Sequence, residues 1–210
     1  MANSMVHWNG CHLVAIDVET TGLDPNFHEI VQIAVLPLDS NIKPRTDVLP
    51  FYIMIKPEYP ERFSKEAQSV NKLKLSDIME RGFDKFAAID LFEEWMDKIG
   101  LPYNASGHNR CNLIPLAQNW PFDREFVAAW LGRETFHLHF HPRYRDTMTV
   151  ANFINDNMGM QGEDVPYHKV NLTWLCKKLN IRIDRAHDAL SDCAATAAVY
   201  REFVRRRMIF

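Results

Sequence analysis

The stretch AIDVETTGLDP, residues 15–25, places two acidic residues in a run that otherwise has the pattern of a buried strand. At the strand period of two, Ile16 and Val18 share one face. Asp17 and Glu19 then lie together on the opposite face. Two like charges at the end of a half-buried strand repel each other and lose hydration, so they require a cation, a proton or a substrate beside them. The pair therefore predicts a strand with a binding site at its end.

The composition predicts one globular domain. The chain has 210 residues, of which 47% are hydrophobic and 24% charged, which is enough for one substantial core but too few for two typical domains with a linker. We expect a single domain over residues 1–210, with its core over about 11–205. The formal net charge of −3 argues against a broad phosphate-binding surface, so any nucleic-acid partner has to be bound locally.

The sequence shows no pattern for a membrane span or for secretion. No apolar run approaches the roughly 20 residues of a membrane span, and the first residues lack a basic region followed by an apolar one. We therefore expect a cytoplasmic protein without a membrane partner. The absence of a C-x-x-C pair argues against a zinc ribbon or a redox motif and favours reduced, buried thiols. The cysteines are Cys11, Cys111, Cys176 and Cys193.

The chain begins with strands and continues with alternating helices and strands. We expect three strands, around residues 13–20, 29–38 and 49–57, joined as an antiparallel meander. Further strands are predicted over residues 112–117 and 138–146, and helices over 65–73, 86–99, 121–131, 148–155, 172–179 and 189–206. This order predicts an α/β fold with a mixed five-stranded sheet flanked by helices.

More acids and a histidine occur on elements that such a sheet can bring together. The stretch HDALSDCAATAAVYREFVRRR, residues 187–207, is rich in alanine, and small side chains let a helix lie close against a sheet. Close approach would bring Asp192 next to the acidic pair of the first strand. His187 lies just before this helix, and Asp123 lies in the first turn of another predicted helix. Four carboxylates and one histidine are therefore expected at one end of the sheet.

Four carboxylates in one site are tolerable only if cations neutralise them. Oxygen ligands select hard divalent ions such as Mg²⁺ or Mn²⁺ over zinc. Two such ions about 3.5–4 Å apart form the usual clamp for in-line displacement at phosphorus. Histidine suits the removal of a proton from the attacking water near neutral pH. The pattern therefore predicts two-metal chemistry on a phosphate ester, with His187 as the general base.

Three stretches resemble, in the right order, the exonuclease motifs of the DEDDh 3′-to-5′ exonucleases. DVETTG (17–22), QNWPFD (118–123) and HDALSD (187–192) are similar to D-x-E-T-T-G, H-N-x-x-F-D and H-x-A-x-x-D. RDTMTVA (145–151) resembles the family's D-T-x-x-x-A segment. The family has a ribonuclease H-like fold and includes the proofreading subunit of bacterial DNA polymerase III, ribonuclease T and oligoribonuclease. The resemblance covers roughly Leu13 to Phe203.

The resemblance implies an enzyme that releases nucleoside 5′-monophosphates from the 3′ end of single-stranded nucleic acid, with DNA slightly favoured over RNA. His187 would be the general base of a two-metal mechanism. The carboxylates implied to hold two Mg²⁺ or Mn²⁺ ions are Asp17, Glu19, Asp123 and Asp192. The residues implied to contact the substrate are Thr20, Thr21, Gly22, Leu23 and Asn119.

The partners of such a domain stay open at this point. Several members of the family dimerise, so a homodimer is one expectation. The alternative to a free-standing enzyme is a proofreading or scaffolding subunit of a DNA polymerase, or a non-catalytic protein that binds 3′ ends. The complete set of five catalytic residues argues against a silent protein, and the final helix near the end of the chain argues against a polymerase-binding tail.

One feature departs from the family's pattern. The family's usual His before the Asn is Gln118 here, which puts a nucleotide contact in question. An alternative GHN at residues 107–109 lies fourteen residues before Asp123 instead of four, so the later alignment is preferred.

The run FHLHFHP (136–142) would place His137, His139 and His141 on one strand face and could mimic a zinc or copper site. No carboxylate or cysteine in the run completes such a site, so we expect a polar strand face or loop.

Overall fold

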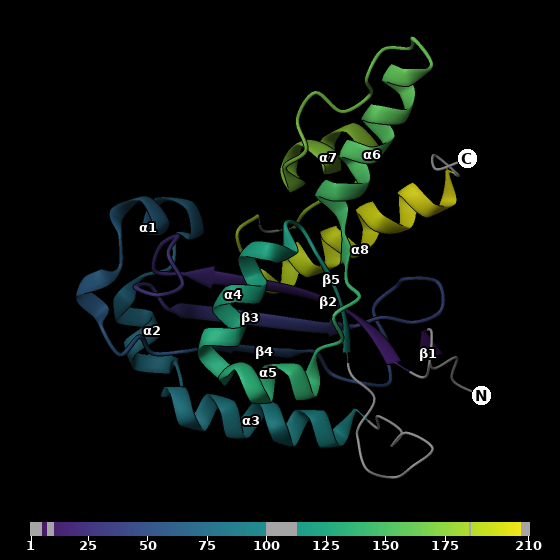
Figure 1. The fold of residues 1–210 in the computed structure, drawn as a ribbon. Coiled ribbons are helices and arrows are strands. Elements are labelled where there is room, and N and C mark those ends of the chain that lie inside the picture. Colours follow the sequence, from purple (N-terminus) through teal and green to yellow (C-terminus); the bar gives the residue numbers. More distant parts are fainter. Residues whose placement is uncertain (1–5, 8–10, 100–112, 185, 207–210) are drawn as a thin grey trace.

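The fold is a central sheet with helices on both faces (Figure 1). The computed structural model describes residues 6–7, 11–99, 113–184 and 186–206. The sheet order is β4-β3-β2-β5-β6, and the short β1 (Val6–His7) pairs with β2. The path consists of β2 (Cys11–Thr20), β3 (Ile30–Pro37), β4 (Phe51–Met54), β5 (Leu113–Ala117) and β6 (Arg145–Asp146).

The strand directions confirm the predicted mixed sheet. Strands β2, β3 and β4 form an antiparallel meander, whereas β5 runs parallel to β2 and β6 runs parallel to β5. The strand predicted over 49–57 is shorter, because regular pairing with β3 covers only Phe51–Met54.

Different helices cover the two faces of the sheet (Figure 1). One long helix, α8 (Ala189–Arg205), lies against one face, and α6 (Thr147–Met160) and α7 (Leu172–Leu179) pack against it. The other face is covered by α3 (Lys85–Lys98), α4 (Trp120–Leu131) and α5 (Arg133–His139). Between β4 and α3 lie η2 (Pro60–Arg62), α1 (Lys65–Asn71) and α2 (Leu75–Arg81).

The alternation along β2 divides the core into two parts. Ile16 packs among aromatic side chains of the helical layer that includes Phe92. Ala15 faces the opposite way and packs under α8, beside Cys193 and Ala197. These small side chains on α8 let the helix lie close to the sheet, as the alanine-rich sequence predicts. The face assignment that places Asp17 and Glu19 on the α8 side of β2 follows from the same alternation.

The strand predicted over residues 138–146 is wrong except at its end. Residues up to His139 belong to α5, and only Arg145–Asp146 forms a strand, β6. Phe136 and Phe140 are four residues apart, which is the helical spacing, and their rings stack with centroids 5.2 Å apart. The apolar contacts of these two rings therefore favour a helix over the alternating strand.

The predicted placement of His137, His139 and His141 on one strand face is wrong for the same reason. His137 and His139 lie on α5, so the three histidines do not share a strand face. His139 is buried, and its Nε2 lies 2.6 Å from Glu93 Oε1 of α3. The Nδ1 atom of His141 accepts a hydrogen bond from the backbone N–H of Arg143. Within the described residues, no metal-ligand cluster includes any of the three.

Other expectations concern the thiols and the membrane. Cys11, Cys176 and Cys193 are buried, as predicted. Cys111 and the GHN stretch, residues 107–109, lie outside the described residues. In the described part of the chain, no helix combines the length and the apolar character of a membrane span.

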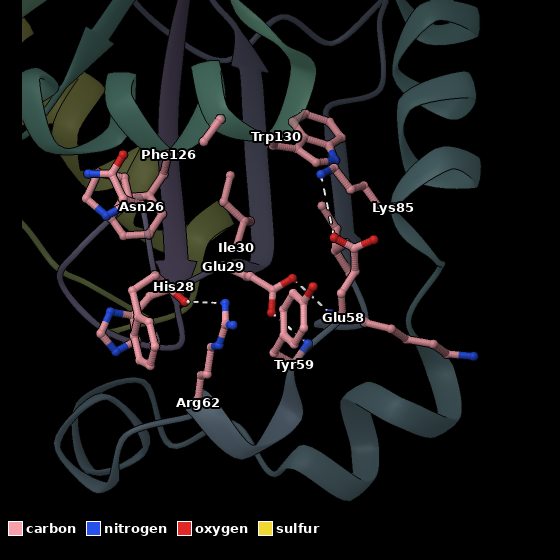
Figure 2. Close-up of a pocket in the computed structure, with 15 residues that line it drawn as sticks. Asn26, His28, Glu29, Ile30, Glu58, Tyr59, Arg62, Lys85, Phe126 and Trp130 are labelled. Atoms are coloured by element: carbon pink, nitrogen blue, oxygen red, sulfur yellow. Dashed lines mark hydrogen bonds and ion pairs between the residues drawn. The ribbon is translucent and has the colours of Figure 1, made fainter.

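A pocket of about 160 Å³ opens where β3 begins (Figure 2). Its wall includes the Arg62 guanidinium, whose carbon lies 3.7 Å from the centre of the Tyr59 ring and 4.6 Å from the centre of the Phe27 ring. The Glu29 carboxylate accepts the backbone N–H groups of Glu58 and Tyr59 and so fixes the segment after β4. None of the predicted catalytic side chains lines this pocket.

Candidate active site

The acidic residues converge where β2 extends beyond its parallel neighbour. Strand β5 pairs with β2 only over residues 12–15, so the following stretch of β2 is not covered by β5. In that stretch the backbone N–H of Val18 donates to Asp123 Oδ1 of α4 over 3.2 Å. Ligands of open α/β sheets commonly bind at the carboxyl ends of strands where the connections diverge. The edge of β2 is such a place.

Asp123 is positioned by the start of α4. Helix α4 follows Asn119, which has a positive φ of 70°. The backbone N–H of Trp120 donates to Asp146 Oδ2 over 2.6 Å, and Asp146 also caps α6 by accepting from the N–H of Thr149. Asp146 therefore ties the beginnings of α4 and α6 to the end of β6. The sequence singled out this residue only through the D-T-x-x-x-A resemblance.

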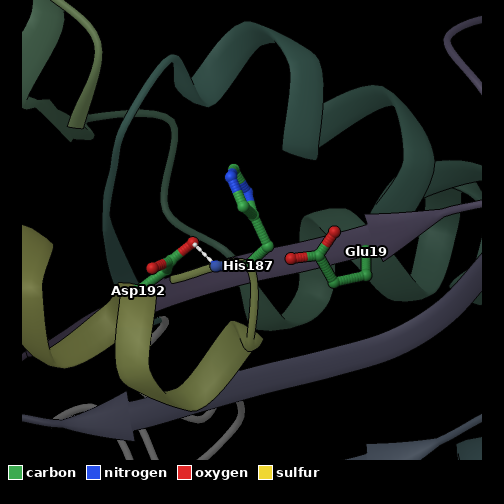
Figure 3. Close-up of side chains that lie close together, drawn as sticks. All are labelled: Glu19, His187 and Asp192. Carbon is green, nitrogen blue, oxygen red and sulfur yellow. Dashed lines mark hydrogen bonds between the residues drawn. The ribbon is translucent and has the colours of Figure 1, made fainter. Parts of the chain in front are cut away.

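Asp192 and His187 come from the start of α8 (Figure 3). The backbone N–H of His187 donates to Asp192 Oδ2 over 3.1 Å, which folds the turn before α8 back onto the helix. Asp192 is 8% exposed, and its other oxygen, Oδ1, is buried without a hydrogen-bond partner. One potential ligand atom from each of Glu19, His187 and Asp192 lies within 4.8 Å of the others. The predicted cluster is thus present for these three side chains.

Burial and mutual repulsion raise the pKa values of the carboxylates. Burial, Asp192 and Asp188 raise the pKa of Glu19 from its ordinary 4.5 to about 8. The pKa of Asp17 lies well above its usual range because of burial and then of the nearby charges of Asp123 and Glu19. Burial also raises the pKa of Asp123 and of Asp192, although backbone N–H groups oppose the shift in both. Without a cation, the site therefore retains protons near neutral pH.

The donor set fits a divalent cation. The unpartnered Asp192 oxygen and the Glu19 carboxylate can both face one ion, and carboxylate oxygens are the ligands that hard divalent ions prefer. The nearby charge of Asp123 raises the pKa of Asp17, but the oxygens of these two residues are not part of the compact three-residue cluster. The structure therefore brings Glu19, Asp192 and His187 together, and the full set of four metal-binding carboxylates stays a prediction.

Without metal, the protein should lose stability as the pH rises. A carboxyl group with a raised pKa binds its proton more tightly in the folded state, so the stabilisation is complete below pH 4.5 and is lost as the pH rises through about 8 for Glu19. We expect the melting temperature in EDTA to fall by about 5 °C or more between pH 5 and pH 8. Mn²⁺ should largely restore it at pH 8, and Glu19→Gln should flatten the dependence. Equal melting temperatures at both pH values in EDTA would contradict this expectation.

A pocket of about 490 Å³ adjoins the acidic cluster. Its wall includes Glu19, Thr20, Gly22 and the exposed Leu23, followed by Phe122 of α4 and residues of α1. Glu19, a predicted catalytic residue, therefore faces the same pocket as apolar side chains. Of the predicted substrate contacts, Thr21 and Asn119 do not line this pocket.

The turn after β2 is held by its own threonines. Thr20 Oγ1 donates to the carbonyl oxygen of Gly22 over 2.6 Å, and Thr21 Oγ1 accepts from the backbone N–H of Glu29. Both threonines are buried, so their side chains shape the turn. A Cβ atom at Gly22 would lie 2.3 Å from the His28 ring, so any larger residue here would have to displace that side chain.

Gln118, which stands where the motif usually has histidine, is part of the scaffold. Its Oε1 accepts from Thr147 Oγ1 over 2.6 Å, and its Nε2 donates to the carbonyl oxygen of Val170 over 2.7 Å. These bonds link the end of β5 to α6 and to the segment before α7. Both ends of the amide are used in this way, which gives the residue a structural role.

This mixed sheet has the ribonuclease H-like fold, and Glu19, Asp192 and His187 lie together at the end of β2, where the three motifs predict an exonuclease site. The chain belongs to the exonuclease family, whose model matches residues 14–200. The family resemblance carried by the three motifs is thereby confirmed. Divalent metal ions are typical of this family.

Similar sequences come from both polymerases and nucleases. The chain is 26% identical over 192 residues to the PolC-type DNA polymerase III of Thermotoga petrophila, covering 91% of this chain but only 12% of that protein. It is also 26% identical over 200 residues to ribonuclease T of Buchnera aphidicola subsp. Schizaphis graminum, covering 92% of this chain and 83% of that protein. The chain thus spans about an eighth of the length of the polymerase relatives.

Solved structures show the same fold. Escherichia coli exonuclease I in complex with a dT13 oligonucleotide has a TM-score of 0.71 at 19% identity, over 94% of this chain and 42% of that chain. Cell-death related nuclease 4 has a TM-score of 0.70 at 17% identity, over 94% of this chain and 65% of that chain. The predicted ribonuclease H-like fold is confirmed.

Proposed function

We propose that this protein is a 3′-to-5′ exonuclease that removes single nucleotides from the 3′ end of single-stranded nucleic acid. The main observation in its support is that Glu19, His187 and Asp192 lie close together beside the pocket at the end of β2. Membership of the exonuclease family supports this reaction. The single-stranded substrate is supported by exonuclease I, which has the same fold and was solved with oligonucleotides.

In this proposal the carboxylates bind the metal ions and the histidine removes a proton from the attacking water. Two divalent ions, Mg²⁺ or Mn²⁺, would be held by Asp17, Glu19, Asp123 and Asp192 and would supply the positive charge that stabilises the phosphate as negative charge develops on it. His187 is exposed at the rim of the site and takes a proton from the attacking water. The water oxygen bonds to phosphorus, the bond from phosphorus to the 3′ oxygen breaks, and the product is a nucleoside 5′-monophosphate.

The pocket beside Glu19 would receive the terminal nucleotide. The buried threonines hold the turn so that its backbone faces the pocket together with Gly22. Leu23 is 82% exposed, which leaves an apolar side chain available to pack against a base. Asn119, at the start of α4, remains a proposed contact to the nucleotide outside this pocket. A slight preference for DNA over RNA is part of this proposal.

A second candidate is the same exonuclease acting as the proofreading part of a DNA polymerase. The observation that favours it is the match to PolC-type DNA polymerase III, in which the similar stretch is a small part of a long chain. Recovery of a stable polymerase complex with the protein would support this role. Full activity of the isolated protein without such a complex would favour the free-standing enzyme.

The test is degradation of matched 5′-labelled single-stranded DNA and RNA in Mg²⁺, Mn²⁺ or EDTA. We expect a ladder that shortens one nucleotide at a time from the 3′ end with either metal, and none in EDTA. The same oligonucleotides labelled at the 3′ end should release labelled mononucleotide at once. Cleavage at internal positions, or no cleavage with either metal, would refute the proposal.

A further inference from the structure

The turn that carries His187 is braced by two residues from distant strands. The hydroxyl group of Tyr52, on β4, donates to Asp188 Oδ2 over 2.6 Å. The amide nitrogen of Gln32, on β3, donates to the Tyr52 hydroxyl oxygen over 3.1 Å. The other end of Gln32, Oε1, accepts the backbone N–H of Ala189 over 3.0 Å. A continuous chain of hydrogen bonds thus connects the sheet to the first turn of α8.

Gln32 is an unusual residue for its position. Every residue of β3 is buried, and Gln32 is 3% exposed in an otherwise apolar strand. A buried amide is costly unless both of its ends form hydrogen bonds, and here Oε1 accepts from Ala189 of α8 while Nε2 donates to Tyr52, which in turn bonds Asp188. In the β2–β3 register Gln32 is also the direct partner of Glu19. The buried amide therefore lies between the acidic strand and the start of α8.

The braced turn has a backbone conformation that needs support. His187 has a positive φ of 63°, which is uncommon for a residue other than glycine. Such conformations persist when the surrounding contacts over-determine them. Asp188 supplies those contacts in both directions, because Oδ2 accepts from Tyr52 and Oδ1 accepts from the backbone N–H of Ser191 as the helix cap.

We propose that Tyr52 and Gln32 are positioning residues for the reaction. Acting through Asp188, they fix the His187 turn and the first turn of α8, and with them the placement of His187 and Asp192 relative to Glu19. Neither residue belongs to the three exonuclease motifs. The inference rests on the proposed exonuclease function. It adds two residues of β3 and β4 that hold the catalytic turn in place.

Tyr52→Phe tests the brace, because it removes the hydroxyl group and keeps the ring. We expect kcat on a single-stranded oligonucleotide to fall about tenfold, with KM changed less than about twofold. Tyr144→Phe, which removes the hydroxyl of another partly exposed tyrosine, is the matched control and should retain wild-type kcat. A wild-type kcat in Tyr52→Phe, or an equal loss in both variants, would overturn the inference.

Substitutions at Asp188 show whether the residues act as one unit. Asp188→Asn keeps one acceptor oxygen for two donors, the Tyr52 hydroxyl and the N–H of Ser191, so it should lose part of the activity, whereas Asp188→Ala loses both bonds and should lose more. Tyr52→Phe in the Asp188→Ala background should cost less than about twofold, since the bond is already absent. A further tenfold loss in the double variant would overturn the inference.

Hydrogen exchange provides a readout that does not depend on activity. The amides of Ala189 and Ser191 should exchange about tenfold faster in Tyr52→Phe than in wild type, and the Tyr144→Phe control should be unchanged. Unchanged exchange would overturn the brace even if the enzyme is active. An inactive wild-type protein would refute the proposed function, and the exchange rates would still decide whether the brace exists.

Discussion

Asp17→Asn is expected to lower kcat by about a thousandfold or more and, in the absence of metal, to raise the melting temperature. Both effects have one cause. Burial, and then the nearby charges of Asp123 and Glu19, raise the pKa of Asp17 well above its usual range. The neutral amide of the same shape removes this repulsion, but it also removes an anion that would hold a divalent ion.

The opposite signs of the two effects make the experiment informative. Steady-state cleavage gives kcat, and thermal unfolding in EDTA at pH 7.5 gives stability. Asp90→Asn, an exposed acid on α3, should change neither quantity and is the control for loss of one negative charge. A loss of both activity and stability in Asp17→Asn would indicate a folding defect, and wild-type cleavage would exclude Asp17 from the metal site.

Much of the site follows from local sequence patterns. The period of two places Asp17 and Glu19 on the face of β2 opposite Ile16, and the small residues of α8 explain how Asp192 comes close to them. Ser64 caps α1 by accepting the N–H of Ala67, which is the usual role of a serine directly before a helix. These features depend on neighbours in the sequence, which is why they could be predicted.

The features that could not be predicted depend on distant contacts. Helix α5 replaces the predicted strand because Phe136 and Phe140 contact Trp120 of α4, a partner that the local pattern of residues 136–146 does not include. The bond between Tyr52 and Asp188 joins residues 136 positions apart. A single polar residue, Gln32, in an apolar strand was the signal in the sequence that could have indicated a buried network there.

His187→Asn is the second substitution with a large expected effect. We expect kcat to fall about a hundredfold, because a positioned general base contributes on this order, while the affinity for the oligonucleotide stays near that of wild type. Asparagine is chosen because it tolerates the positive φ of this position, where most side chains would add backbone strain. The loss should therefore reflect the missing imidazole and not a displaced turn.

Imidazole rescue separates a proton-transfer role from a metal-ligand role. His187→Gly also suits the positive φ and leaves space at the exposed rim of the site, so added imidazole should restore part of its kcat in Mn²⁺. His168→Gln, an exposed histidine elsewhere, is the control and should cleave at the wild-type rate. Calorimetric titration with Mn²⁺ should give nearly the same affinity for wild type and His187→Gly. If the variant instead loses Mn²⁺ affinity and imidazole restores nothing, His187 acts as a metal ligand and the general base has to be sought elsewhere.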